Sequence, residues 1–286
     1  EGTGEVVYIV DADTGPTSGP IKAFTSTDMS SVATKVATLD SNNDGVTDRI
    51  YVSDKGGNVW RMDMPSADKS TWSIFKFATL SGQTTSDSRM FFAEPSVAQT
   101  QFNNIHSTNG QLTYQSIPYD AVAIGSGNRT NPLGTVTDDM FFVLQDRNVL
   151  TNQFGTGGIA IPDALTIDDL YDVTAASPDT EAQQLTFGAK RGWFYNFSNT
   201  GEKSLSSSLI FNGEVYFTSF IPPLNEEIDF DVGVCGFAGQ GRLYRLGLHK
   251  GTRTYSELYY DIGERVPDTP QIVIPKPEDG EESIAY

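Results

Sequence analysis

The segment LDSNNDGVTDRIYVSDKGGNVWRMDM, residues 39–64, carries the strongest indication of the fold. It opens with an acidic, asparagine-rich loop and continues into two short runs, residues 49–53 and 58–62, that are rich in aliphatic and aromatic side chains. The pair Gly56-Gly57 separates these runs, and glycine is the residue most easily placed in a tight turn. The segment therefore predicts a polar loop followed by a β-hairpin.

Short strand-like runs of the same kind recur along the whole chain. They are separated by glycine, asparagine or aspartate and lie at residues 6–10, 121–124, 140–144, 193–197, 208–211, 214–220 and 242–248. Helical periodicity has one candidate, residues 164–176, for which a loop insertion is the alternative. We therefore expect an all-β protein.

Several segments repeat one plan, in which an aromatic-rich strand, a glycine-bearing turn and a second strand follow one another. They are YIVDADTG (8–15), IYVSDKGGNVWRMDM (50–64), VYFTSF (215–220) and GRLYRLGLHKG (241–251). The interval from Asp11 to Asp63 suits one blade of a β-propeller, roughly 40–50 residues. The imperfect repeats predict a modified β-propeller with long loop insertions, at residues 81–88, 101–111, 155–162 and 224–231, rather than a plain sandwich.

The charge balance restricts the partners of the chain. With 19 basic and 37 acidic residues the net charge is −18, which repels nucleic acid and anionic lipid. No run of 18 apolar residues is present, so we expect no direct membrane insertion. Cys235 is the single cysteine, which excludes an internal disulfide. Divalent cations are the natural counterions of such a surface.

The loop of residues 40–48 has the pattern of a calcium site. Oxygen-bearing side chains stand at its positions 1, 3, 5 and 9, and Gly45 at position 6 permits the sharp turn that brings them together. Calcium takes six to eight oxygen ligands at about 2.3–2.6 Å. The predicted ligands of Ca²⁺ are the side chains of Asp40, Asn42, Asp44 and Asp48 and the backbone carbonyl of Val46.

This loop differs from a helix-flanked EF-hand. Position 12 is Tyr51 instead of glutamate, and the residues that follow have the pattern of a strand. We therefore expect the loop to connect two strands. A turn rich in asparagine and aspartate that binds no metal is the alternative.

No catalytic residue is predicted. The two histidines, His106 and His249, lie in polar, loop-like sequence, and neither a metalloprotease motif nor a serine nucleophile elbow is present. Adjacent acidic pairs such as Asp138 and Asp139 are expected to be solvated in loops. The tryptophans are expected to pack between blades, and the alternative is an exposed tryptophan that stacks on a sugar: Trp60, Trp72 and Trp193. Four arginines are expected to pair with carboxylates at blade junctions: Arg61, Arg129, Arg147 and Arg191.

Residues 39–64 resemble the calcium loop and following blade of the PilY/PilC family of type IV pilus biogenesis and tip-adhesin proteins. AIGSGNRTNPL (123–133) and MFFVLQDRNV (140–149) are similar to that family's GSG-x-R-x-x-P and D-R-N segments. GWFYNF, GEKSLSSSLIFNGEVYFTSFIP and CGFAGQGRLYRLGL resemble its C-terminal blades, and PQIVIP (270–275) resembles its closing strand. These stretches follow the family's order.

The resemblance implies that residues 1–270 are blades of a larger C-terminal propeller, incomplete in this chain, and that residues 271–286 are its closing strand and an acidic tail. The five predicted calcium ligands fall on the family's metal positions. The implied protein is exported and lies at the bacterial cell surface, at the pilus tip, or in the outer membrane or periplasm.

The implied function is a non-enzymatic, calcium-binding module of pilus assembly and tip adhesion. It would regulate pilus extension and retraction, bind minor pilins or the pilus tip complex, and support attachment to host or abiotic surfaces. One alternative is a propeller enzyme of quinoprotein-like or glycan-active type. The other is a passive, integrin-like scaffold that calcium stabilises.

Overall fold

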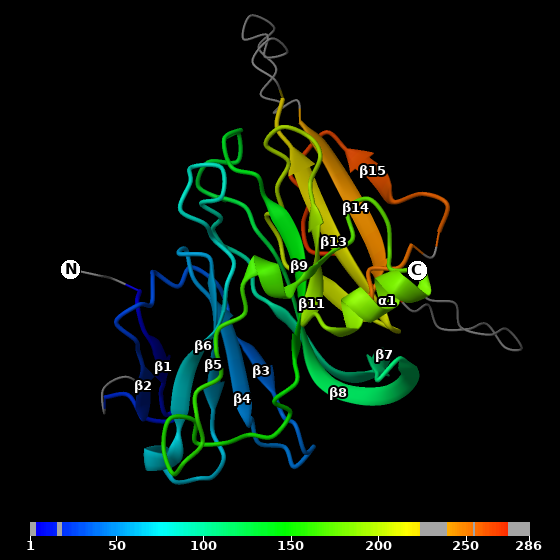
Figure 1. Cartoon of the computed structure of the whole chain (residues 1–286). Coiled ribbons are helices and arrows are strands. Elements are labelled where there is room, and N and C mark those ends of the chain that lie inside the picture. The colour runs from blue at the N-terminus through cyan, green and yellow to red at the C-terminus, as the bar shows by residue number, and fades with distance from the viewer. Residues whose placement is uncertain (1–3, 16–18, 224–238, 254, 274–286) are drawn as a thin grey trace, which may run out of the picture.

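The structure is a computed structural model that describes residues 4–15, 19–223, 239–253 and 255–273 (Figure 1). Strands dominate it. The described residues contain one α-helix, α1 (Glu181–Gly188), and short 3₁₀ turns at Lys69–Thr71 and Ile167–Asp169. Within these ranges no helix combines the length and apolarity needed to cross a bilayer.

Two antiparallel sheets form the N-terminal part. The smaller pairs β1 (Val7–Ile9) with β2 (Lys22–Phe24). The larger has four strands that neighbour one another in sequence order: β3 (Ala37–Leu39), β4 (Arg49–Ser53), β5 (Asn58–Asp63) and β6 (Ser73–Thr79). An antiparallel sheet of four consecutive strands is the blade unit of a propeller.

A five-stranded sheet occupies the middle of the molecule. Its order is β10-β11-β9-β8-β7, and only β10 runs parallel to its neighbour. The strands are β7 (Ser96–Thr108), β8 (Gln111–Gly125), β9 (Met140–Asp146), β10 (Tyr171–Asp172) and β11 (Gly192–Asn196). The strands β7 and β8 continue beyond this sheet as a long curled ribbon (Figure 1).

The C-terminal part is a second four-stranded antiparallel sheet. Its strands again neighbour one another in sequence order: β12 (Leu209–Phe211), β13 (Glu214–Ile221), β14 (Gln240–Gly247) and β15 (Tyr259–Gly263). The chain is therefore all-β, with curled sheets that correspond to an incomplete β-propeller, as the sequence predicts.

Three apolar cores lie between successive sheets. Side chains alternate across a strand, so β9 sends Phe142 toward the core shared with β3–β6 and Phe141 toward the core shared with β12–β15. The ring of Phe141 stacks on that of Phe217 with centroids 3.7 Å apart. A strand buried on both faces needs a continuous apolar run, which explains the sequence MFFVL of β9.

The helix expected at residues 164–176 is wrong. This segment holds the 3₁₀ turn Ile167–Asp169 and the short strand β10, and its apolar residues Leu170 and Val173 are buried between sheets. The helix of this region is instead α1, which begins at a capping box formed by Thr180 and Gln183. That spacing of threonine and glutamine is a helix-start signal in the sequence.

The loop insertion expected at residues 101–111 is also wrong. These residues belong to the β7–β8 ribbon, which turns at Asn109-Gly110 with φ of 53° and 78°. Asn-Gly is the preferred two-residue turn of a β-hairpin, so the signal was present in the sequence. Residues 81–88 and 155–162 are without strands, as expected, and 224–231 lie outside the described residues.

Of the closing strand and tail expected at residues 271–286, the structure describes residues 271–273. These three residues are not part of a strand. The last strand in the described part of the chain is β15, which forms the edge of its sheet beside β14.

Candidate functional site

The predicted calcium loop connects β3 to β4 at one end of the N-terminal blade. The backbone at both of its ends is held by the blade itself: the N–H of Asp48 donates to the carbonyl of Leu39 at 2.9 Å, and the carbonyl of Asp48 accepts from Met64 at 2.8 Å. Asp40 and Asp48 are partly buried, whereas residues 42–46 are exposed. The loop is therefore an exposed arc on a fixed base.

Backbone N–H groups bind the loop carboxylates from inside. The two oxygens of Asp40 accept from the N–H groups of Asp44 at 3.2 Å and Gly45 at 2.8 Å. Asp44 Oδ1 accepts from the N–H of Val46 at 2.8 Å. Gly45 has a φ of 86°, a conformation that L side chains rarely adopt, and this allows its N–H to point back at Asp40.

The remaining contacts extend this pattern to both ends of the loop. Asn42 Oδ1 accepts from the N–H of Asp44 at 2.9 Å, and Asp48 Oδ2 accepts from the N–H of Ser41 at 2.8 Å. Partial burial would raise the pKa of Asp40, but the backbone hydrogen bonds outweigh it, so the net shift is downward. The Asp40 carboxylate is thereby kept charged.

The donor set fits calcium in its chemistry. All five predicted ligands are oxygen atoms, and a carboxylate oxygen that accepts one N–H retains a second lone pair for a cation. Among the described residues, however, no three acidic, histidine or cysteine side chains converge closely enough to hold a metal ion, and the carboxylates of this loop are no exception. Ion binding would therefore require the loop to contract.

The residue after the loop, Arg49, enters a buried ionic cluster between the blade and the five-stranded sheet. Its guanidinium group pairs with Asp120 of β8 and donates to the carbonyl of Val149 at 2.7 Å. The Tyr51 hydroxyl donates toward Asp120 at 2.9 Å and Asp146 at 3.0 Å. These side chains are fully buried, so the base of the loop is coupled to a neighbouring sheet.

Arg61 forms the second half of this cluster. It pairs with Asp63 at 2.6 Å and Asp146 at 2.7 Å, and it donates to the carbonyls of Asn148 at 2.6 Å and Leu150 at 3.1 Å. The cluster holds three carboxylates and two guanidinium groups. Burial raises the pKa of Asp120 to about 6, although the charge of Arg49 opposes the shift.

The predicted pairing of arginines with carboxylates holds for Arg61 and not for the other three. In the described structure Arg129 donates to the carbonyl of Leu205, Arg147 to the Gln145 side chain and the Lys190 carbonyl, and Arg191 to the Gln145 carbonyl. Backbone and amide oxygens thus replace the expected carboxylates at these positions.

The tryptophans pack between sheets as expected. Trp60 and Trp193 are buried, and their indole N–H groups donate to Asp54 and to the carbonyl of Leu248, at 2.8 and 2.9 Å. Trp72 is partly buried and stacks on Phe24.

Two expectations for polar, loop-like residues are wrong, the solvation of Asp139 and the loop position of His106, whereas His249 does lie in a turn. Asp139, expected to be solvated, is buried and accepts from Ser126 Oγ at 2.7 Å. His106 lies in β7. His249 lies in the turn after β14, but it is half-buried, and its Nδ1 is 2.8 Å from the Tyr119 hydroxyl. The pair Glu226 and Glu227, like Cys235, lies outside the described residues.

Sequence reasoning missed the buried pair Glu202 and Lys203. The Lys203 ammonium donates to the carbonyls of Gly134 at 2.5 Å and Gly201 at 2.6 Å, and Glu202 accepts from the hydroxyl of Tyr244 at 2.6 Å. Charged residues beside glycine and serine have the composition of a surface loop. No local signal marks them as buried, because their partners come from distant segments.

Comparison with known proteins gives a sequence relative and a solved structure of similar fold. The chain is 23% identical, over 224 residues, to the type IV pilus biogenesis factor PilY1 homolog of Xylella fastidiosa, a match that covers 76% of this chain and 14% of the relative. The crystal structure of the Pseudomonas aeruginosa PilY1 C-terminal domain superposes with a TM-score of 0.56 at 17% identity, over 87% of this chain and 54% of that one. The comparison with protein-family profiles gives no match.

The chain thus spans a small part of its sequence relative and about half of the solved domain. The solved domain and this chain share a fold over 87% of this chain. The chain is therefore similar in sequence to a PilY1 homolog and shares the fold of a PilY1 C-terminal domain.

Proposed function

We propose that this chain is a non-enzymatic, calcium-binding module of type IV pilus biogenesis. The similarity to a PilY1 homolog supports the pilus role. One structural observation carries the calcium role: the oxygen-rich loop of residues 40–48 leads directly into Arg49, which a neighbouring sheet holds by a buried ion pair. A change in the loop is therefore transmitted to a joint between two sheets.

Asp40, Asn42, Asp44, the Val46 carbonyl and Asp48 would hold the ion. Bound calcium supplies two positive charges that offset the repulsion among three nearby carboxylates. The backbone N–H groups of Asp44, Gly45 and Val46 keep the Asp40 and Asp44 side chains turned inward before the ion arrives. These hydrogen bonds restrict the side chains before binding, and the loop would then contract around the ion.

A calcium titration of metal-stripped protein tests this proposal. An ion that binds the folded chain and not the unfolded chain stabilises it by about 2.7 kcal/mol when free calcium is about 100 times Kd. We expect added calcium to raise the melting temperature of the wild type. It should leave the melting temperatures of Asp44→Asn and Asp48→Asn unchanged. Asp68→Asn is the matched control, because Asp68 also accepts a backbone N–H in an exposed turn of the same blade, and it should respond like the wild type.

The pilus role has a separate readout. We propose minor pilins or the pilus tip complex as partners, on an exported protein at the cell surface, where the module would regulate extension and retraction and support surface attachment. Calcium should strengthen the binding of the wild type to a minor-pilin complex. It should not change the affinity of Asp48→Asn for the same complex. If calcium raises the melting temperature but not the affinity for pilins, the loop is a passive structural clamp and the regulatory proposal fails.

A further inference from the structure

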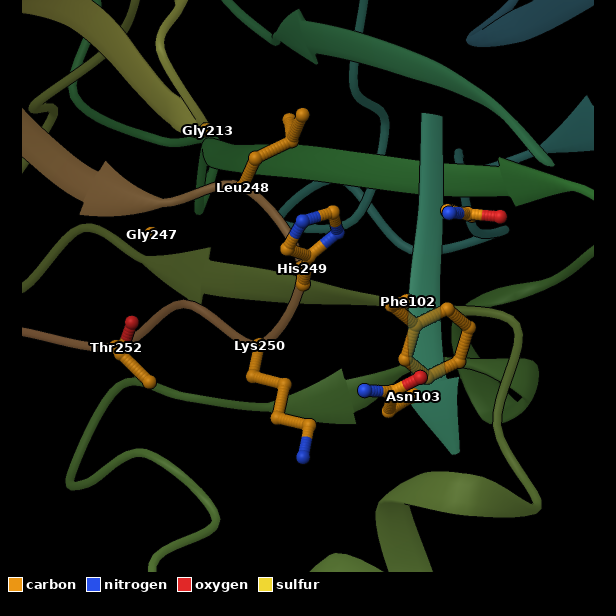
Figure 2. Close-up of a pocket in the computed structure, with 9 residues that line it drawn as sticks. Phe102, Asn103, Gly213, Gly247, Leu248, His249, Lys250 and Thr252 are labelled. Atoms are coloured by element: carbon orange, nitrogen blue, oxygen red, sulfur yellow. The ribbon is translucent and has the colours of Figure 1, made fainter. Parts of the chain in front are cut away.

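A pocket of about 390 Å³ opens between β7 and the turn that follows β14, far in sequence from the calcium loop (Figure 2). Strand β7 contributes residues 101–103, and the β14 turn contributes residues 247–250 and Thr252. A volume of this size lies within the range of small-molecule sites, about 300–1,000 Å³.

An aromatic pair forms one wall of this pocket. The imidazole of His249 lies nearly parallel to the ring of Phe102, with centroids 6.3 Å apart and an interplanar angle of 18°. Phe102 is buried in the core, and the Tyr119 hydroxyl holds the other side of the imidazole through Nδ1. Burial, assisted by the charge of Lys250, lowers the pKa of His249, so the ring is neutral near pH 7.

The backbone of the turn is fixed by its own hydrogen bonds and by two neighbours. The N–H of Gly247 donates to the Thr252 carbonyl at 2.8 Å, and the N–H of Gly251 donates to the Gly247 carbonyl at 2.9 Å. Leu248 donates to Gly213 at 2.9 Å and accepts from the indole of Trp193 at 2.9 Å. The pocket is therefore preformed, which lowers the entropic cost of binding a ligand.

Two polar side chains of this pocket, Lys250 and Asn103, have no hydrogen-bond or ion-pair partner among the described residues. Gln101 Oε1 accepts from Ser116 at 3.3 Å, which leaves the Gln101 amide N–H groups free to donate. In Figure 2 the Lys250 and Asn103 side chains both lie below the His249 ring.

The charge of the pocket is opposite to that of the chain. Among the described residues that line it there is no aspartate or glutamate, and Lys250 is the one cation, although the whole chain carries a net charge of −18. An ammonium group that faces no carboxylate favours an anionic ligand. Amide groups and a neutral imidazole beside an aromatic wall are suited to hydroxyl groups on a compact ring.

We propose that this pocket binds an acidic sugar residue, with the carboxylate at Lys250 and Asn103 and the sugar ring beside the half-buried imidazole of His249, which the buried Phe102 ring supports from behind. The site is independent of the calcium loop and of the pilus role.

A chemical-shift titration of the full chain tests this assignment, with glucuronate as the probe and glucose and acetate as comparators. We expect saturable shifts for residues 101–103 and 247–252 with glucuronate, and binding at least about 10-fold weaker with glucose or acetate, about 1.4 kcal/mol. Lys250→Gln should weaken glucuronate binding about 10-fold. Asn103→Asp, which places a carboxylate at the same position, should abolish it.

Lys55→Gln is the matched control, because it removes the same charge from an exposed turn of the N-terminal blade. It should bind glucuronate like the wild type, and all variants should keep the wild-type melting temperature. Equal affinity for glucose and glucuronate, or unchanged binding by both Lys250→Gln and Asn103→Asp, would overturn the proposal. Binding of an acidic peptide at these residues without any binding of glucuronate would overturn it as well.

Discussion

Asp139 is a buried carboxyl group with one satisfied oxygen. Oδ1 accepts from Ser126, while Oδ2 has no hydrogen-bond partner in the described structure. Burial raises the pKa of Asp139 to about 6, although the hydrogen bond from Ser126 and the charges of Lys203 and Arg89 oppose the shift. A raised pKa means that the folded chain holds the proton more tightly than the unfolded chain does.

The stability contributed by this proton is complete below about pH 4 and is lost as the pH rises through about 6. Asp139→Asn cannot ionise, so its free energy of unfolding relative to the wild type should rise by about 1–3 kcal/mol between pH 4 and pH 7. Urea unfolding at pH 4, 5, 6 and 7 measures this difference. A difference between Asp139→Asn and the wild type that stays constant over this pH range would contradict the prediction.

At the scale of elements, α1 is held against the β7–β8 ribbon by its last residue. The Asn104 amide donates to the carbonyl of Gly188 at 3.1 Å, and a Cβ at Gly188 would lie 2.5 Å from the carbonyl oxygen of Ile105 and 2.6 Å from Asn104 Oδ1. Both contacts are shorter than van der Waals distance. The absence of a side chain at Gly188 therefore allows the helix to approach the ribbon.

Gly188→Ala should lower the free energy of unfolding by about 1–3 kcal/mol, because the backbone of α1 or of the ribbon must move. Helix propensity alone predicts the opposite sign, a gain of up to about 1 kcal/mol for alanine. Urea denaturation distinguishes the two. Thr186→Ala, on the exposed side of the same helix, should change stability by less than about 0.5 kcal/mol. A stabilised Gly188→Ala protein would show that the helix end is not tightly packed.

At the scale of the whole molecule, the sheets are stacked in sequence order, and the five-stranded sheet has an apolar core on each face. The calcium loop and the ionic cluster of Arg49 and Arg61 belong to the side that faces β3–β6. The sheet β12–β15 packs on the opposite face, through Phe217 and Tyr244. Calcium should therefore affect one side of the molecule more than the other.

Amide hydrogen exchange with and without calcium measures this asymmetry. We expect slower exchange in β3, β4 and residues 146–152, because these segments are joined to the loop through Arg49, and unchanged exchange in β12–β15. Asp48→Asn should remove the protection, and Asp68→Asn should keep it. Uniform slowing over all sheets would indicate that calcium stabilises the fold globally, without a defined path from the loop.

Strands that are marked by their own apolar residues and by flanking turn residues were predicted well. The runs at residues 49–53, 140–144 and 214–220 became β4, β9 and most of β13, since each is apolar and bounded by turn residues. Of the ribbon β7–β8 only residues 121–124 were predicted as a strand; the rest was missed because its polar side chains face solvent over a large part of its length. The loop of residues 40–48 was placed correctly between two strands, and its calcium binding stays a prediction.

The sequence by itself determined the all-β class, the positions of apolar strands such as β4, β9 and β13, and the oxygen-rich loop, because strand periodicity and turn chemistry depend on neighbouring residues. Only the tertiary structure decided which charges are buried. Asp139, Glu202 and Lys203 look like surface residues in the sequence, yet each is enclosed by partners from distant segments. The pocket beside His249 arises in the same way, since β7 and the β14 turn are about 140 residues apart and meet only when the sheets pack.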